Sequence, residues 1–407
     1  MGYLRDTGDI MNWITGWAFR KSITASRSSG AVTSYQMRVR VGESSGSSSY
    51  DVHTGGMCLP SFNDLRFTAG DGLTALPYWV ESVTGATPNQ TAVVWVKFDS
   101  ISTTDTTFYM YYGNTSASSE SSGSSTFAVF DDVEHGSNGD TITSPWVLST
   151  GAATVSTAQS HSGSRSYKLF GIGATASISR PFIPTDNTSI SIWLYSRSTY
   201  CGLLRCGNGS HSISLWTDSA NNLSYNNSYN NGVTSGFVIS PSTWTKIEVR
   251  NVNWTTATYD LYANDSLVLA SLVMLANTQF ANVVEFVGDY GSGWDNWLDD
   301  FIVKSSVSPE PSISAYGAVE PFPDYVPSII LTPSLHAPTA MQQLAVPQLI
   351  STAGLPGTSC HLEVAVPLQL IEPQLLKPTG YRPLSVDAIS NVGWVLTENN
   401  KRFIRGV

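Results

Sequence analysis

The stretch Phe130-Asp131-Asp132-Val133-Glu134 and the distant stretch Trp297-Leu298-Asp299-Asp300-Phe301-Ile302-Val303 decide the fold. Each places paired acids beside a short apolar run. The segment between them is rich in strand patterns, so we interpret the two stretches as the first and last strands of one β-sandwich. Such outer strands can lie side by side, which would bring the acids together. Because calcium accepts oxygen ligands in irregular geometry, we predict a calcium site at this strand edge. The alternative is two loop ends with solvated acids.

The composition points to an all-β protein of an extracellular or virion surface. A length of 407 residues corresponds to about two to four domains. Apolar residues make up 41 % and aromatic residues 11 %, whereas charged residues reach only 13 %, about half the usual share. The net charge of −10 comes with no run of Lys or Arg, so nucleic-acid binding lacks its electrostatic basis.

No targeting or membrane signal is present in the sequence. The N-terminus lacks the apolar core of a signal peptide, and no run approaches the roughly 18 apolar residues of a membrane span. This favours a chain made without a secretion signal, as virion proteins are, unless a leader lies outside this sequence. Cys201 and Cys206 flank Gly-Leu-Leu-Arg and could bridge a hairpin, although we favour buried thiols over a disulfide or a zinc pair.

Strand patterns fill the first hundred residues after a short arm. Residues 1–12 are predicted to form a flexible or partner-docked arm. Residues 13–114 alternate apolar and polar positions in short runs that Gly, Asn, Ser and Pro separate, which predicts a β-sandwich. The predicted strands are 17–24, 35–41, 65–68, 76–82, 91–98 and 107–112.

Five motifs occur in order within this domain. They are Trp-x-Phe-Arg-Lys-x-Ile-Thr from Trp17, Leu-Arg-Phe from Leu65, Leu-Pro-Tyr-Trp-Val-Glu-Ser from Leu76, Val-Val-Trp-Val-Lys from Val93, and Phe-Tyr-Met-Tyr-Tyr-Gly-Asn from Phe108. The segment resembles a β-sandwich family of unknown function that commonly precedes a concanavalin A-like or laminin-G-like domain in prokaryotic and viral surface proteins. The resemblance implies fold and context, and no chemistry. Residues 115–126 are a Ser-rich tract, which we interpret as a linker too polar to pack.

Residues 127–320 are predicted to form a second sandwich. Alternating segments recur at 189–195, 211–216, 243–250, 258–263, 283–287 and 298–303. This region resembles laminin-G-like and carbohydrate-binding jelly rolls. In those domains an acidic first strand, a Ser-His-Ser-Gly-type turn and an acid at the start of the last strand often share one calcium ion.

The resemblance implies a ligand set for this calcium ion. It consists of Asp132 or Glu134, a backbone carbonyl in the turn from Ser160 to Gly163, and Asp300. We leave Asp299 out of this set, because strand alternation would place it on the opposite face from Asp300.

Residues 321–407 change character. Prolines recur throughout, with short apolar runs between them. Proline removes a ladder donor, so these runs are predicted to be edge strands or extended segments. We expect a stalk, docking or oligomerisation region, and a small immunoglobulin-like domain is the alternative.

Sugar binding is the chemistry that the sequence supports best. Carbohydrate sites combine exposed aromatic faces with Asn, Asp or Arg, and two Asn- and Gly-rich loops offer this combination. Their candidate ligand-binding residues are Tyr225, Tyr229, Tyr290 and Trp294. Asp132 and Glu134 share a predicted strand face and could form a hydrolytic pair. However, the stretch lacks the three alternating acids of concanavalin-like glucanases, so we predict no enzyme.

We therefore predict a non-enzymatic virion structural or adhesion protein, such as a tail fibre, spike or baseplate-associated protein. Its partners would be other copies of itself in a homo-oligomer such as a trimer, other virion proteins and a host surface glycan. One alternative is a filament or capsid-decorating protein without a ligand. Another is a secreted carbohydrate-binding module or glycan hydrolase.

Overall fold

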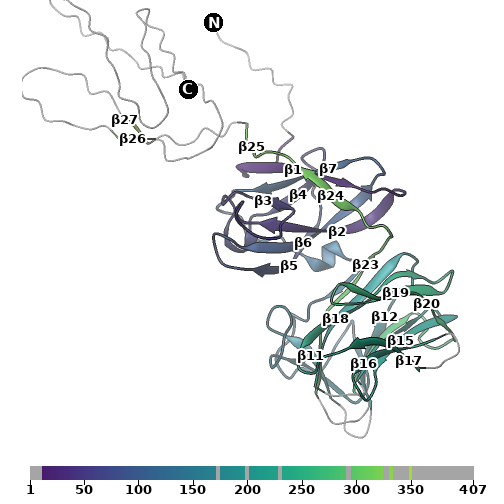
Figure 1. Cartoon of the computed structure of the whole chain (residues 1–407). Helices are drawn as coiled ribbons and strands as arrows, with labels where there is room; N and C mark the ends of the chain where they lie inside the picture. Colours follow the sequence, from purple (N-terminus) through teal and green to yellow (C-terminus); the bar gives the residue numbers. More distant parts are fainter. Residues whose placement is uncertain are drawn as a thin grey trace, which may run out of the picture. The chain divides into compact units, whose positions relative to one another are not determined.

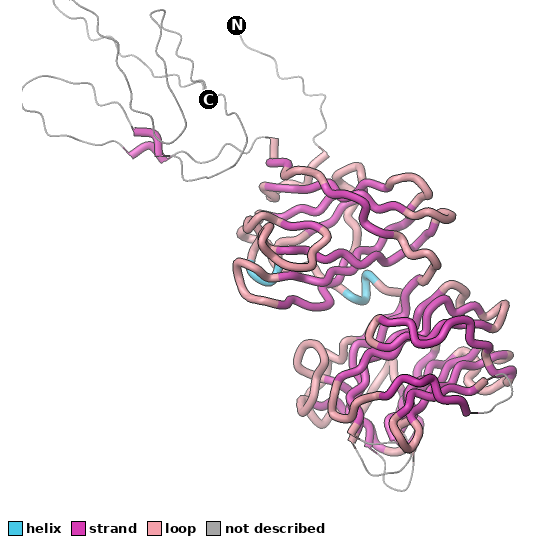
Figure 2. The backbone as a smooth tube through the Cα atoms, in the orientation of Figure 1, coloured by secondary structure: helices cyan, strands magenta, loops and turns pink. Residues whose placement is uncertain are grey.

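The computed structural model describes residues 12–170, 175–197, 201–227, 232–289, 295–323, 330–332 and 348–350. Contacts divide the chain into two units, Met1–Tyr325 and Val326–Val407. Among the described residues, the helical pieces are the 3-10 turn η1 (Pro60–Phe62) and the single-turn helix α1 (Gly123–Thr126). The remaining regular structure is β-strand (Figure 2). The predicted all-β class is therefore confirmed.

The first sandwich packs two sheets face to face. One sheet has the order β24-β1-β7-β4, with β25 also paired to β1, and the other has the order β3-β2-β6-β5 (Figure 1). The strands are β1 (Phe19–Ser26), β2 (Val32–Gly42), β3 (Val52–His53), β4 (Arg66–Ala69), β5 (Tyr78–Thr84), β6 (Thr91–Ile101), β7 (Thr106–Tyr112), β24 (Ser312–Tyr316) and β25 (Glu320–Pro321). The six predicted strands of residues 13–114 appear as β1, β2, β4, β5, β6 and β7.

Alternation builds this core, as the sequence pattern indicates. On β2, Met37, Val39 and Val41 are buried in the first sandwich. Arg38 between them is exposed, because successive side chains of a strand point to opposite faces.

The predicted domain boundary at residue 320 is wrong. After the second sandwich, β24 and β25 return and pair with β1 of the first, with Ile23 opposite Tyr316 and Phe19 opposite Pro321. Phe322 then donates its N–H to the Ala18 carbonyl at 2.8 Å. An edge strand presents unpaired backbone groups, and here the distant segment satisfies those of β1. Local sequence cannot identify such a non-local partner.

The Ser-rich linker also packs, contrary to the prediction. The Ser122 N–H donates to the Tyr78 carbonyl and the Val80 N–H donates to Ser121 Oγ, each at 2.8 Å. The linker thus pairs with the edge of β5. The α1 helix follows, capped by the Ser122 hydroxyl, and its Thr126 is fully buried. Serine supplies donors and acceptors where an apolar residue would leave this strand edge unsatisfied.

The second sandwich has two larger sheets. Their orders are β10-β11-β23-β13-β18-β19-β20, with β8 on β23, and β17-β16-β15-β14-β22-β12-β9, with β21 on β15. The strands are β8 (Val129–Asp131), β9 (Val147–Thr150), β10 (Ala152–Ser156), β11 (Ser166–Phe170), β12 (Ala176–Pro181), β13 (Thr188–Ser196), β14 (Gly202–Gly207), β15 (His211–Thr217), β16 (Asn222–Asn226), β17 (Gly232–Val238), β18 (Trp244–Asn253), β19 (Thr258–Ala263), β20 (Ser266–Val273), β21 (Leu275–Ala276), β22 (Val283–Asp289) and β23 (Asn296–Ser305).

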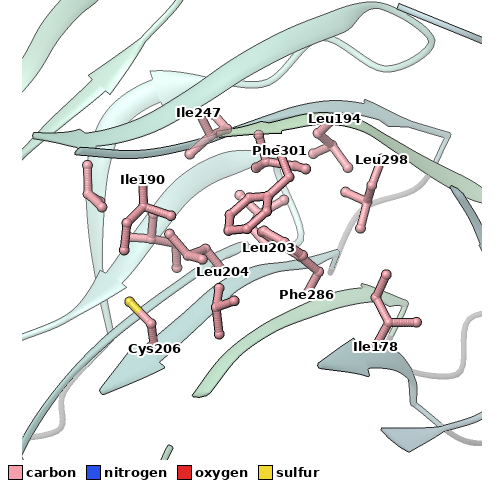
Figure 3. Close-up of a cluster of buried hydrophobic side chains, with 14 of the residues drawn as sticks. Ile178, Ile190, Leu194, Leu203, Leu204, Cys206, Ile247, Phe286, Leu298 and Phe301 are labelled. Carbon is pink, nitrogen blue, oxygen red and sulfur yellow. The ribbon is translucent and has the colours of Figure 1, made fainter. Parts of the chain in front are cut away.

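The core of the second sandwich lies between these sheets. Ile190, Leu194 and Ile247 come from one sheet, and Leu204 and Phe286 come from the other (Figure 3). Each of these five side chains is at most 1 % exposed. Burial of this kind stabilises by about 25 cal/mol for each Å² of apolar surface removed from water.

The predicted pairing of the first and last strands is confirmed. β8 runs antiparallel to β23, with Asp131 opposite Phe301 and Val129 opposite Val303. The acids of both stretches therefore lie at one end of this pair.

Cys201 and Cys206 do not bridge a hairpin. Cys201 directly precedes β14 and Cys206 lies near its end, so both belong to one extended segment, and both are buried thiols. Burial raises the pKa of the Cys206 thiol to about 12, so it is unreactive.

Few residues outside these two sandwiches are described. In the second unit, β26 (Ile330–Thr332) and β27 (Gln348–Ile350) pair antiparallel at two of the predicted apolar runs. Most of the predicted oligomerisation region, and the arm 1–12 apart from Asn12, lie outside the described residues. In the described part of the chain no helix is both long and apolar enough to span a membrane.

Candidate functional site

Four aspartates gather where β8 meets β23. We call Asp131, Asp132, Asp299 and Asp300 the acid cluster. Asp131, Asp299 and Asp300 are at most 6 % exposed, and Asp132 is half-buried. Buried carboxylates are costly unless hydrogen bonds or cations compensate them, so the partners of each acid decide its role.

Asp131 is a structural anchor. Its carboxylate accepts from Trp146 Nε1 at 2.5 Å, from the Tyr167 hydroxyl at 2.9 Å and from the Val133 N–H at 2.9 Å. His135 Nε2 lies 3.2 Å from the same carboxylate. With these donors already bound, the Asp131 carboxylate has little remaining capacity to accept a hydrogen bond from a ligand.

Asp132 is the acid that remains available. The described hydrogen bond to its carboxylate is a long one, 3.3 Å from the Glu134 N–H. Burial, followed by the charges of Asp131 and Asp300, raises the pKa of Asp132. Asp132 and Asp300, from the two predicted metal-binding stretches, are therefore close enough to influence each other.

Both acids of β23 hold the loop that contains His161, and the prediction that Asp299 points away is wrong. Asp299 accepts the His161 N–H at 2.8 Å, while Asp300 contacts His161 Nδ1 at 2.6 Å and the Ser162 hydroxyl at 2.7 Å. The cause is a bulge. The register of β23 against β13 shifts here, and Asp300 has a left-handed φ of 48°. Burial and the Asp300 charge raise the pKa of Asp299.

Glu134 is held by the same loop, farther along. Its carboxylate accepts the N–H groups of Ser164 at 2.6 Å and Arg165 at 2.8 Å, and Arg165 Nη1 lies 3.1 Å away. Burial opposes ionisation, but these bonds outweigh it and keep the pKa of Glu134 below its usual value. Gly163 packs against this carboxylate. The half-buried Ser160 directly precedes His161.

The predicted strand face shared by Asp132 and Glu134 is not present. β8 ends at Asp131, and Val133 turns the chain with a left-handed φ of 57°. The described residues also contain no group of three or more His, Cys, Asp or Glu side chains arranged to hold a metal ion. The calcium ligand set remains a prediction, which would need carbonyl and hydroxyl oxygens beside Asp132 and Asp300.

A cavity of about 510 Å³ opens beside the acid cluster. It is lined by Trp79, Ser121, Ser122, Gly123, Ser124, Phe130, Asp131, Asp132, His135 and Pro145. The rings of Trp79 and Phe130 meet edge to face at 4.9 Å. Gly123 permits this arrangement, because a β-carbon there would lie 2.2 Å from the Phe130 ring. The cavity thus combines aromatic, hydroxyl and carboxylate groups, and its lining includes neither Lys nor Arg.

Of the four predicted sugar-binding residues the structure describes Tyr225, which does not line this cavity. Tyr225 is half-buried and packs against the core of the second sandwich. Tyr229, Tyr290 and Trp294 lie outside the described residues. Sequence reasoning missed Trp79 and the linker serines, because only the docking of the linker onto β5 brings them beside Phe130.

Comparison with known proteins adds context. A family model described as a domain of unknown function (DUF2341) matches residues 61–149, which run from the first sandwich through the linker into the second. A search of curated proteins found no match.

Solved structures resemble part of the chain. The binding domain of botulinum neurotoxin DC in complex with SialylT is 14 % identical over 40 % of this chain and 42 % of its own, with a TM-score of 0.29. Domain 4 of the arabinanase AbnA from Geobacillus stearothermophilus, with arabinotriose, is 12 % identical over 45 % and 85 %, with a TM-score of 0.30. The family 22 carbohydrate-binding module of Clostridium thermocellum Xyn10B is 14 % identical over 44 % and 94 %, with a TM-score of 0.26. This chain spans less than half the length of the neurotoxin chain. At these TM-scores, function has to be argued from the chain's own geometry.

Replacing Gly163 with alanine should loosen the loop that holds Glu134. Gly163 has a φ of 53°, and a β-carbon there would lie 2.3 Å from Glu134 Oε1. Gly139→Ala is the matched control, since Gly139 also has a positive φ, of 92°, but has no neighbour within 4 Å. Left-handed strain costs about 1–2 kcal/mol in both variants. Urea unfolding should show a larger loss in the free energy of unfolding for Gly163→Ala than for Gly139→Ala. Equal losses in the two variants would contradict the close contact of Gly163 with Glu134.

Proposed function

We propose that this chain is a non-enzymatic glycan-binding protein of a virion or other extracellular surface. The observation that carries the proposal is the cavity beside Phe130. A sugar presents an apolar face and a ring of hydroxyls. The cavity offers the half-buried Phe130 ring, which packs on the Trp79 ring (6 % exposed), together with serine hydroxyls and Asp132. A half-buried carboxylate with one long described hydrogen bond has acceptor capacity to orient a sugar hydroxyl.

Hydrolysis is the less supported alternative. Retaining glycosidases place two carboxylates about 5 Å apart across a cleft. Asp132 lines the cavity and has a raised pKa, as a general acid would. Glu134 is not part of the lining and is bound by Ser164 and Arg165, and Asp131 is occupied by its own donors. Asp132 is therefore the one carboxylate in the lining of this cavity without strong donors, which favours binding over hydrolysis.

We also propose that calcium orders the acid cluster, with Asp132, Asp300 and oxygens of the Ser160–Gly163 turn as ligands. Four carboxylates approach one another here, and both Asp132 and Asp299 have raised pKa values because of burial and neighbouring acids. A hard cation would relieve this repulsion and stabilise the ionised forms.

The adhesion role assigns a separate task to residues 321–407. We propose that they assemble the chain into a homo-oligomer, such as a trimer, and dock it to other virion proteins. Several copies would then engage a host glycan together, and avidity would rise without new contacts. A filament or decorating protein without a ligand is the alternative, and it would share the oligomer but bind no glycan.

Glycan binding is tested with the full chain on a panel of immobilised glycans. We expect binding that weakens about tenfold in Asp132→Asn and in Phe130→Leu, since the first removes an anionic acceptor and the second an aromatic face. Asp99→Asn, at an exposed position of β6, is the control and should bind as the parent does. Failure of the parent chain to bind any glycan would refute the function, whereas equal binding by all variants would refute the cavity as the site.

Calcium should raise the thermal unfolding temperature, and a chelator should lower it again. A ligand present at 100 times its dissociation constant contributes about 2.7 kcal/mol of stability. In Asp300→Asn, calcium should no longer raise the unfolding temperature, whereas in Asp99→Asn it should raise it as in the parent chain. An identical melting temperature with calcium and with chelator, in the parent chain, would remove the calcium proposal.

The assembly role is measured by light scattering of the full chain beside a chain that ends at Pro323. This end point keeps β25 and Phe322, which complete the first sandwich. We expect an oligomer for the full chain and a folded monomer for the shorter one. Two monomers would leave residues 324–407 without an assembly role.

A further inference from the structure

A row of aromatic side chains crosses the outer face of the second sandwich. On β13, Ile190, Ile192 and Leu194 belong to the core, so Trp193 and Tyr195 project from the opposite face. Both are half-buried rather than buried. The solvent face of a sheet normally has polar residues, so two large aromatic residues there require an explanation.

Strand register extends this row over three neighbouring strands. Tyr195 lies opposite Trp244 of β18 on one side and opposite Trp297 of β23 on the other. The Tyr195 ring centroid is 5.5 Å from that of Trp244 and 5.6 Å from that of Trp297. We name Trp297, Tyr195 and Trp244 the aromatic row. Trp297 is 3 % exposed and forms its buried end, whereas Trp244 is half-buried.

The acid cluster adds another ring beside this row. His161 stacks on Trp193 with a centroid distance of 3.6 Å and an angle of 14°, and it meets Trp244 edge-on at 5.9 Å. Asp300 holds His161 through Nδ1, and Asp299 holds its backbone N–H. The imidazole is therefore positioned by the same acids that surround Asp132, and it enlarges the aromatic surface.

The tilt of the rings argues against a flat crystalline ligand, and the local charge argues against an anionic one. Tyr195 is inclined by 59° to Trp244 and by 84° to Trp297, so these rings cannot all lie flat on a planar crystalline surface. The nearby ammonium groups are occupied, since Lys168 pairs with Asp295 at 2.9 Å and Lys246 pairs with Asp265 at 3.0 Å. The buried carboxylates of Asp299 and Asp300 lie beneath the His161 end and would disfavour an anion.

We propose that Trp193, Tyr195 and Trp244, together with His161, form a second glycan surface that takes a single soluble chain of neutral sugars. Tyr195 and Trp244 contact the apolar sides of the sugars, the stacked pair of His161 and Trp193 borders them, and the chain crosses β13 and β18. This inference rests on the proposed glycan-binding function and assigns it a ligand class and a surface separate from the cavity. A purely structural role for the row, as cross-strand packing, is the competing account.

The test measures binding of the full chain to soluble neutral polysaccharides by affinity electrophoresis, with xylan, mannan, galactan and a mixed-linkage glucan as probes. Polygalacturonate and hyaluronan serve as anionic probes. We expect retardation by at least one neutral polymer and by neither anionic one. Tyr195→Ala and Trp244→Ala should each weaken that binding about tenfold, and Trp244→Phe, which retains a ring, should recover most of it.

Tyr109→Ala is the matched control, because Tyr109 is a half-buried aromatic residue on a strand of the first sandwich. Thermal unfolding of every variant shows whether it folds. Folded row variants that bind like the parent would overturn the inference, and so would tighter binding to the anionic polymers. In both cases the glycan-binding function would stand. Absence of binding to every soluble polymer and to every glycan of the panel would remove the function and this inference together.

Discussion

The antiparallel pairing of β8 with β23 is the contact on which the site depends. It places Asp131 opposite Phe301 and joins two acidic stretches that lie far apart in the chain. The bulge in β23 then changes the outcome of this pairing. Because Asp300 takes a left-handed conformation, both Asp299 and Asp300 reach the His161 loop. A regular strand would have turned one of them to the other face. One local distortion thus brings together four carboxylates where three would otherwise meet.

Like charges held this closely must be compensated. Asp131 is compensated by hydrogen bonds from Trp146 and Tyr167, and Glu134 by Ser164 and Arg165. Asp132 accepts only one long described hydrogen bond, whereas Asp299 accepts the N–H groups of His161 and Asp300. Burial with neighbouring acids raises the pKa values of both. The cluster is therefore divided into structural acids and available ones. This division explains why the proposed ligand set contains Asp132, together with Asp300, whose charge raises the pKa of Asp132, and leaves Asp131 out.

Two aromatic surfaces are related to this cluster in different ways. The cavity is built from β5, the docked linker and the start of the second sandwich, so its rings come from separate parts of the chain. The aromatic row belongs to one sheet, and the acid cluster reaches it through His161. The cavity forms only if the linker packs on β5. The aromatic row requires only the register of β13 with β18 and β23.

Alternation and turn residues in the sequence were sufficient to predict the all-β class and many strands, because a period of two directly reports which side chains enter a core. The paired acids at the two ends of the second sandwich led to the predicted pairing of β8 with β23. The proposed glycan surface had the same kind of signal, since Trp193 and Tyr195 lie on the outward-facing side of β13, whose inward-facing positions include Ile190, Ile192 and Leu194. Only the tertiary structure decided that Asp299 joins Asp300, that Ser121 and Ser122 pair with β5, and that β24 returns to β1. These outcomes depend on a bulge and on unsatisfied strand edges. Both arise from contacts between residues far apart in the chain, which no local pattern records.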